Sequence, residues 1–290
     1  MKFFKELETE LKIRGYSDQT IRSYVYENKK FLDFLNTSSN SEYQKSLLSV
    51  GNKRTPQDVN KRDIRAYQAF LTSDKPLKPS TINLILSALK FFYVEVLKND
   101  IFQEIKRPKR EEKLPVVLTK DEISQIIENT KNKKHRLLIE LLYGSGLRVS
   151  EAINLKIDDL NLKEKINLIR GGKGKKDRRI ILPNKLKSKL ASYFKKRKDK
   201  NPFIFHYRED HISSRQAQRI VKNAASRAGI RKKVFCHALR SSFATHLINS
   251  GVDIRDVQIL LGHKRISTTQ IYTEVSTERL NAIKSPLDRL

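Results

Sequence analysis

The stretch FCHALRSSFATHLINSG, residues 235–251, places two histidines and an arginine in one predicted helix that ends at Gly251. His237 and Arg240 are three residues apart, so their side chains share one face of that helix. A histidine and an arginine on one face can bind an anion together, but they can equally be an ordinary surface pair. The residues that accompany this pair elsewhere in the chain separate the two interpretations.

Positive charge dominates the composition. Sixty Lys and Arg residues stand against 32 Asp and Glu residues, which gives a net charge of +28 and a pI of about 10.1. Such an excess repels itself in the compact state, and a polyanion relieves the repulsion, so nucleic acid is the leading candidate partner. A membrane surface is the weaker alternative, because the basic residues are spread along the chain and no lipidation signal is visible.

The N-terminus and the cysteine content indicate where the protein resides. Cys236 is the single cysteine, so no internal disulfide can form, and acidic residues interrupt the N-terminal stretch MKFFKELETEL. No apolar run approaches the roughly 20 residues that a bilayer span needs. We therefore expect a soluble cytoplasmic protein, associated with the nucleoid, with no membrane partner.

The first hundred residues predict helices. Apolar residues recur at helical spacing after the start signals Ser17, Pro56 and Ser80, and residues 37–55 form a polar segment that predicts a loop. This pattern predicts an all-helical bundle of four or five helices over residues 1–105.

A change of composition marks the end of this bundle. The segment KRPKREEKLP, residues 106–115, has two prolines, dense charge and no apolar periodicity, so we expect a linker over residues 106–118. Thr119 and Glu122 then have the spacing of a capping box, which starts a new helix. The second domain is predicted to cover residues 119–290.

The second domain combines helices with one predicted β-hairpin. A buried helix ends at the Gly-Ser-Gly sequence of residues 144–146, and a new helix begins near Arg148. In EKINLIRGGKGKKDRRIILP, residues 164–183, apolar and polar residues alternate on both sides of a glycine-rich basic tip, which predicts the hairpin. Helices are expected again from about residue 184 onward. The fold class is therefore mainly α with a small β-sheet.

The tip of this hairpin carries five basic residues in the seven positions 173–179. The tip lacks the Gly-x4-Gly-Lys-Ser/Thr spacing of a nucleotide-hydrolase phosphate loop. A basic, glycine-rich tip can reach into a nucleic-acid groove, although charge runs are usually solvent-exposed faces that only raise solubility. The candidate DNA contacts are Lys173, Lys175, Lys176 and Arg178.

Two further short helices are predicted near the C-terminus. Asp253 caps the first, and Ser267 with Gln270 has the spacing of a capping box for the second. Several side chains of this region can surround one pocket: His237, Arg240, His263 and Tyr272. Each of them taken alone is more readily explained as an ordinary surface or capping residue.

With Arg148 and Lys173, these residues form an ordered set that closely resembles the tyrosine recombinase family. YGSGLRVSEAINLKIDDL (143–160) resembles the family's first arginine motif, and HALRSSFATHLINSGVDIRDVQILLGHKRISTTQIY (237–272) resembles its second box. The resemblance covers about residues 119–280, and the helical N-terminal domain is similar to the family's SAM-like core-binding domain. The short two-domain layout is most similar to the Xer branch, with the archaeal type as one candidate subgroup.

The resemblance implies DNA strand cleavage and rejoining. Tyr272 would attack a backbone phosphate and form a covalent 3'-phosphotyrosyl bond, which stores the energy for rejoining, so no nucleotide cofactor is expected. Arg148 and Arg240 would clamp the non-bridging oxygens with forked donors that a lysine cannot match. By the same resemblance, His237 is the candidate base and His263 the phosphate-stabilising partner. Lys173 is the candidate general acid.

Glu151 lies one helical turn after Arg148, and we expect it to orient Arg148 or the histidine pair rather than to contact the phosphate. No metal is expected, because two-metal phosphodiester chemistry needs clustered carboxylates and Asp158 and Asp159 are the only adjacent pair in this region. The family pattern gives that pair no such role.

The family grips double-stranded DNA as a clamp of two domains and works as a homotetramer on two duplexes. An amphipathic stripe in the last eighteen residues, which includes Leu280 and Leu287, would dock on a neighbouring protomer; the alternative is packing on its own domain. An Xer-type recombinase that resolves chromosome dimers is the leading hypothesis. The alternatives are an integrase or excisionase of a mobile element, a non-catalytic DNA-binding protein of the same fold, and a type IB topoisomerase.

Overall fold

The computed structural model describes residues 2–37, 54–109, 114–169 and 177–273. The chain forms two compact units, residues 1–112 and 113–290, and each unit has its own hydrophobic core.

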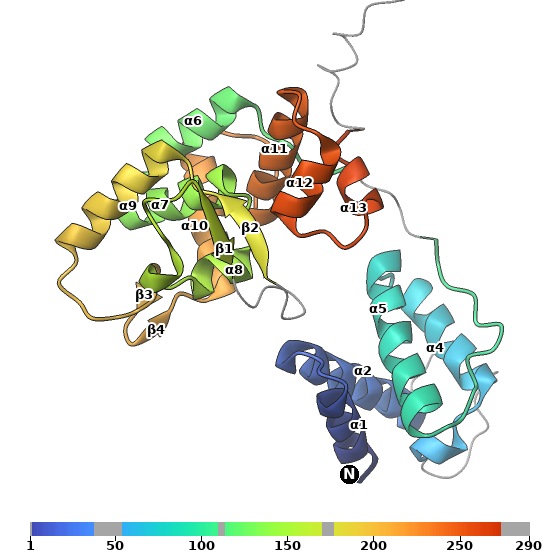
Figure 1. Cartoon of the computed structure of the whole chain (residues 1–290). Helices are drawn as coiled ribbons and strands as arrows, with labels where there is room; N and C mark the ends of the chain where they lie inside the picture. Colours follow the sequence, from blue (N-terminus) through green and yellow to red (C-terminus); the bar gives the residue numbers. More distant parts are fainter. Residues whose placement is uncertain (1, 38–53, 110–113, 170–176, 274–290) are drawn as a thin grey trace, which may run out of the picture. The chain divides into compact units, whose positions relative to one another are not determined.

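The first unit consists of helices, as its apolar periodicity predicts (Figure 1). Its helices are α1 (Lys2–Ile13), α2 (Asp18–Asn36), α4 (Lys61–Thr72) and α5 (Pro79–Lys90), and α5 continues into a π-helical segment, Phe91–Val96. Each helix buries one apolar face in a shared core, whose members include Leu7, Phe31, Ile64 and Leu86.

The helix start signals of this unit were predicted with mixed success. Ser17 caps α2 as expected, because its side chain accepts a hydrogen bond from the backbone N–H of Thr20. The prediction for Ser80 is wrong: α5 begins at Pro79, whose fixed φ suits the first helical position. Pro56 opens only a 3-10 turn, and Asn60 caps α4 instead.

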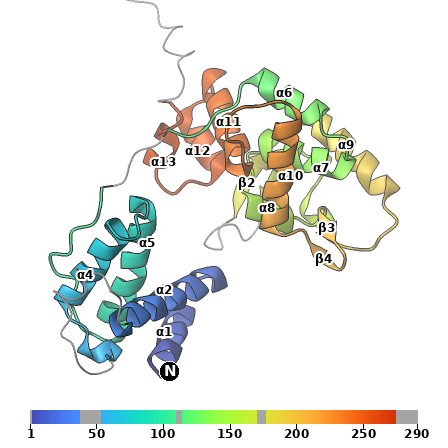
Figure 2. The same ribbon diagram turned by 180° about the vertical axis from the view of Figure 1, so that it is seen from behind.

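The second unit combines eight described helices with two small hairpins (Figures 1 and 2). The helices are α6 (Lys120–Glu128), α7 (Lys133–Gly144), α8 (Val149–Asn154), α9 (Asn184–Lys196), α10 (Ser214–Arg227), α11 (Cys236–Asn249), α12 (Ile254–Leu261) and α13 (Ser267–Gln270). A 3-10 turn, Ile157–Asp159, follows α8.

The predicted hairpin is present as β1 (Ile166–Ile169) and β2 (Arg178–Ile181), paired antiparallel so that Leu168 faces Arg179. Its burial runs against the apolar alternation, since Ile166 and Leu168 are exposed whereas Asn167 and Ile169 are buried. A second antiparallel pair, β3 (His206–Tyr207) and β4 (Asp210–His211), was not predicted, because strands of two residues carry no readable alternation.

Helix α11 forms the centre of the second unit. Ten of its fourteen residues are buried, which is typical of a helix that is surrounded by protein on all sides. Helices α7, α10 and α12 all contact it, and Figure 2 shows α10 next to it in the view from behind. Helix α12 also packs on β2, so the hairpin and α11 meet at the same helix.

Several caps position the functional residues. Thr119 and Glu122 form the predicted capping box of α6, and Asp253 caps α12 as predicted. The prediction of a capping box at Ser267 is wrong, because α13 follows directly from Ile266, which is already helical, and no side chain caps it.

Among the described residues, no helix is both long enough and apolar enough to span a membrane.

Candidate active site

A tight turn between α7 and α8 begins the site. Gly146 has φ +58°, and a Cβ at this position would lie 2.4 Å from the Phe243 ring, so both the backbone and the packing require glycine. The carbonyl of Gly146 accepts hydrogen bonds from Nη1 of Arg240, at 2.6 Å, and from Nη2 of Arg178, at 3.3 Å. The turn therefore fixes arginines from two distant segments.

The second fixed point is the C-terminus of α12, where the last carbonyls of a helix lack partners within the helix. Three consecutive carbonyls there each accept a hydrogen bond from a different arginine. Leu260 accepts from Nη1 of Arg178, Leu261 from Nη2 of Arg240 at 2.5 Å, and Gly262 from Nη2 of Arg148 at 3.1 Å. The negative end of the helix dipole favours this concentration of cations.

Arg240 is buried deeply in this arrangement, with 1% of its surface exposed. Its Nη2 also lies 3.2 Å from Nε2 of His263. Burial, followed by the positive charges of Arg148 and Arg178, lowers the pKa of Arg240. An anion at this position would offset that repulsion.

Arg148 combines fixed geometry with access to solvent. It is the N-cap residue of α8, its backbone N–H donates to Oε2 of Glu151 at 2.8 Å, and its Nη1 donates to Oε1 at 2.7 Å. Its side chain keeps 25% of its surface exposed. Glu151 therefore holds both the backbone and the side chain of Arg148.

The carboxylate of Glu151 also binds Arg178, which departs from the sequence-based expectation for this arginine. Nη2 of Arg178 lies 2.6 Å from Oε2, and Arg178 is only 6% exposed, so it does not project from the hairpin as a DNA-contacting side chain. Although burial alone raises the pKa of Glu151, the hydrogen bonds from Arg178 and then Arg148 lower it to about 2.

His263 and Tyr272 lie next to each other at the same helix end. Their rings stack with centroids 6.3 Å apart and an interplanar angle of 22°, and Nδ1 of His263 lies 3.0 Å from Oγ1 of Thr269. Burial, then the charges of Arg240 and Arg148, lowers the pKa of His263 to about 4. Tyr272 is 1% exposed and packs in a small core with Phe243.

His237 occupies the first turn of α11, and the residue remains exposed. Desolvation of its ring, followed by the charges of Arg240 and Arg148, lowers the pKa of His237.

The structure thus brings together most of the residues that the sequence singled out. They are Arg148, Glu151, Arg178, Arg240, His263 and Tyr272, and His237 lies on α11 three residues before Arg240. Lys173, Lys175 and Lys176 lie outside the described residues. Sequence reasoning missed the carbonyls of Gly146 and Gly262 and the hydroxyl of Thr269; the two glycines were the only available signal.

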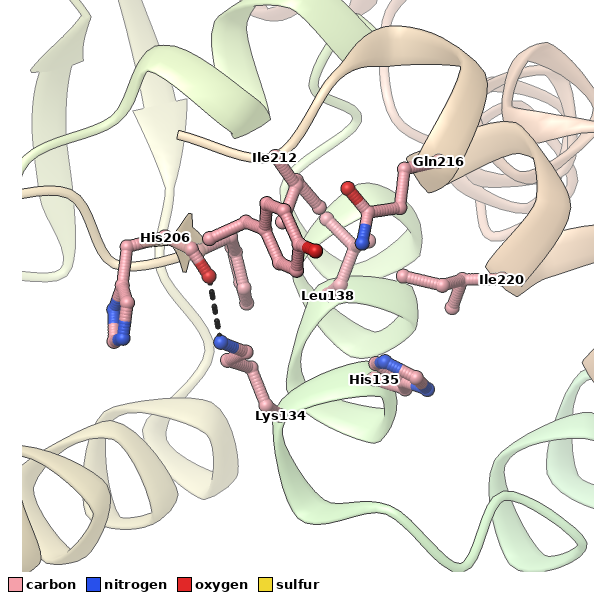
Figure 3. A pocket seen from close by; sticks show the side chains of 9 residues that line it. Lys134, His135, Leu138, His206, Ile212, Gln216 and Ile220 are labelled. Carbon is pink, nitrogen blue, oxygen red and sulfur yellow. Dashed lines mark hydrogen bonds between the residues drawn. The ribbon is translucent and has the colours of Figure 1, made fainter. Parts of the chain in front are cut away.

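A separate pocket of about 140 Å³ shares no residue with this cluster. It lies between α7, α10 and the β3–β4 hairpin, and Figure 3 shows His135 and His206 on opposite sides of Lys134. Nζ of Lys134 donates to the His206 carbonyl at 2.7 Å, and burial is the main cause that lowers the pKa of both histidines. This pocket lacks the paired arginines of the cluster.

Comparison with protein families decides the identity. The model of the phage integrase family matches residues 116–279, and that of the SAM-like N-terminal domain of phage integrases matches residues 3–103. The chain belongs to the phage integrase family. It is a tyrosine recombinase, an enzyme of site-specific DNA recombination, as the arginine, histidine and tyrosine motifs predicted.

Individual relatives agree with this assignment. Tyrosine recombinase XerA of Pyrococcus horikoshii is 38% identical over 281 residues, covering 95% of this chain and 90% of that protein. The putative integrase/recombinase y4qK of Sinorhizobium fredii is 32% identical over 277 residues, which cover 93% of this chain and 89% of that protein. The chain is also similar to a crystal structure of the XerH site-specific recombinase bound to difH substrate, a pre-cleavage complex. The TM-score is 0.68 at 25% sequence identity, and the match covers 90% of this chain and 77% of the XerH chain.

Proposed function

We propose that this tyrosine recombinase cleaves and rejoins strands of double-stranded DNA at a specific site through a covalent 3'-phosphotyrosyl intermediate. The observation that carries the proposal is the arrangement at the end of α12. There Arg148, Arg240 and His263 are held by hydrogen bonds to one another or to the same turn, and the ring of Tyr272 stacks on His263.

The paired arginines are suited to a pentacoordinate phosphate. Both guanidinium groups are held by protein carbonyls, that of Arg148 also by the Glu151 carboxylate, and Arg148 keeps an exposed edge. Donors that are fixed before the substrate arrives do not have to reorganise when negative charge builds up on the non-bridging oxygens. In this proposal Arg148 and Arg240 provide that stabilisation, and Glu151 keeps Arg148 in place.

Tyr272 is the proposed nucleophile. A phenol is largely protonated at neutral pH, so the nearby cationic field and a base must assist its deprotonation. His237 is the proposed base, and Lys173 the proposed general acid for the departing sugar oxygen. Because Tyr272 is 1% exposed, we infer that its segment moves when a duplex phosphate enters.

Double-stranded DNA is the proposed partner of both units. The net charge of +28 favours a polyanion, and XerH, which shares this fold, was crystallised with its difH substrate. We propose that residues 1–105 form the core-binding domain, that the linker of residues 106–118 joins it to the catalytic domain, and that Lys175 and Lys176 contact phosphates. We further propose a nucleoid-associated tetramer on two duplexes, coupled through the C-terminal tail.

Resolution of chromosome dimers is the biological role that we propose, because the XerA similarity extends over 95% of this chain. Integration or excision of a mobile element by the same chemistry is the alternative, favoured by the similarity to y4qK. A cognate site that lies in the chromosome would support the first role, and a site at the ends of a mobile element the second.

A nicked suicide substrate tests the chemistry. Wild-type protein should form a covalent protein–DNA band on a denaturing gel, and Tyr272→Phe should abolish it. The matched control is Tyr207→Phe, which removes a hydroxyl from an exposed tyrosine outside the cluster and should leave the band unchanged. A wild-type protein that binds DNA without forming the band would instead be a non-catalytic binding protein of the same fold.

A further inference from the structure

The side chain of Arg178 makes four hydrogen bonds to the protein and that of Arg240 makes three, although Arg178 is not one of the two proposed phosphate ligands. Its Nε and Nη2 donate to the Glu151 carboxylate at 3.2 and 2.6 Å. It also donates to the carbonyls of Gly146 and Leu260. One guanidinium therefore joins β2, the α7–α8 turn, α8 and the end of α12.

Each of these partners also holds a proposed phosphate ligand or lies beside a residue that does. Gly146 accepts from Arg240, and Glu151 binds Arg148. Leu260 immediately precedes Leu261 and Gly262, which accept from Arg240 and Arg148. Arg178 thus holds in place Glu151, the Gly146 turn and the end of α12, which in turn hold Arg148 and Arg240.

Packing around the α12 end ties Arg178 to the same turn. Gly262 has φ +62°, and a Cβ there would lie 2.6 Å from Cδ of Arg178. The side chain of Arg178 therefore lies directly against the turn that carries the Gly262 carbonyl and His263. A shift of this side chain would move the acceptor of Arg148.

Stability alone explains this arrangement poorly. Desolvating a buried ion pair costs about as much as the pair returns, so such pairs are weak evidence for a stabilising role. The site contains three cationic arginines and one carboxylate, and burying Arg178 beside the buried Arg240 adds to the repulsion that lowers the pKa of Arg240. A geometric role accounts for retaining it.

We propose that Arg178 is a positioning residue of the recombination reaction, which holds Glu151, the Gly146 turn and the end of α12 so that Arg148 and Arg240 converge on one phosphate. The inference rests on the proposed function, because it assigns a role within that reaction. It also links the active site to the hairpin, since Arg178 begins β2, directly after Asp177 and the basic tip.

The test compares Arg178→Gln and Arg178→Lys with the same changes at Arg179, the exposed neighbour on the opposite face of β2. Single-turnover cleavage of the nicked substrate is measured at saturating protein, together with DNA affinity and thermal unfolding. Arg178→Gln should lower the cleavage rate by about 100-fold, the scale of one lost transition-state donor. DNA affinity should stay within about threefold, since the scaffold rather than the phosphate contacts is changed.

Arg178→Lys should recover only part of the rate, because one ammonium can pair with Glu151 but cannot reproduce the fork toward both carbonyls. The pH profile gives an independent readout. Without Arg178, burial should raise the pKa of Glu151, so the rate of Arg178→Gln should fall on acidification, where the rate of Arg179→Gln does not.

Wild-type cleavage rates in the Arg178 variants, or equal losses in the Arg179 variants, would overturn the inference. Unfolding of both Arg178 variants would also overturn it, in favour of a purely structural role. Failure of the proposed function is distinguishable from these results, because in that case the wild-type protein itself forms no covalent complex.

Discussion

Arg240 and His263 are hydrogen-bonded, with Nη2 of the guanidinium 3.2 Å from Nε2 of the imidazole. A guanidinium can only donate, so Nε2 must be the acceptor, and the ring proton lies on Nδ1, which donates to Thr269 Oγ1 at 3.0 Å. His263 is therefore neutral in the free protein and offers no Nε2 proton to a phosphate. Its proposed stabilising role requires that this state changes when DNA binds.

The first prediction concerns the protonation of His263. Burial and two arginine charges lower its pKa to about 4, and a phosphate anion beside those arginines should raise it. Titration of the histidine ring by NMR, with and without inorganic vanadate, should show protonation at a higher pH when the anion is present. The imidazole of His135, which lines the separate pocket that shares no residue with the cluster, serves as the control and should not respond. An unchanged His263 titration would argue against anion binding at this position.

The second prediction concerns stability against pH. The folded protein lowers the pKa of His263 to about 4 and also lowers that of His237, whereas both have the ordinary value of 6.5 when unfolded. Between those values the unfolded chain binds more protons, so the free energy of unfolding should decrease as the pH falls from about 6.5 toward about 4. Denaturant titrations at pH 7 and pH 5 measure this decrease. It should be smaller in His263→Gln, which has one fewer group to titrate.

The third prediction concerns Gly146. An alanine there would need φ +58° and would place Cβ 2.4 Å from Phe243, so the turn must shift and withdraw its carbonyl from Arg240. Gly229→Ala is the matched control, because Gly229 also has positive φ, at +70°, but has open space around it. The control should lose about 1–2 kcal/mol of stability from backbone strain alone. Gly146→Ala should lose more stability and should also slow cleavage at least tenfold, as measured by thermal unfolding and by covalent-complex formation.

The fourth prediction concerns metals. The proposed chemistry stabilises the phosphate with arginines, and the one buried carboxylate of the cluster, Glu151, is bonded to Arg148 and Arg178. Formation of the covalent band should therefore persist at an unchanged rate in EDTA. A loss of cleavage in EDTA that added magnesium restores would contradict the proposal and would favour a metal-dependent nuclease.

Much of the fold could be predicted from local pattern. The capping box at Thr119 and Glu122 and the cap at Asp253 were predicted correctly, because a cap depends on only four or five consecutive residues. The predictions at Ser80 and Ser267 were wrong because the residue before each serine, Pro79 or Ile266, already has helical backbone. The outward orientation of Ile166 and Leu168 was not predicted, because the alternation places these apolar residues toward the core, whereas the fold buries Asn167 and Ile169 instead.

The candidate site divides in the same way. The residue types and their order, from Arg148 to Tyr272, are readable in the sequence and lead to the tyrosine recombinase family. The role of Arg178 was not readable, because its position in a basic run is typical of an exposed side chain, whereas the fold buries it against Glu151.

By itself the sequence determined which side chains are available for chemistry, since helical periodicity, caps and motif spacing depend on neighbours along the chain. Only the tertiary structure decided which carbonyls hold each arginine, that His263 accepts a hydrogen bond from Arg240, and that Tyr272 is buried beside it. These features depend on the end of α12 meeting the Gly146 turn and β2. The bonds from Arg178 to Leu260 and from Arg148 to Gly262 join residues more than 80 positions apart, and no local pattern encodes them.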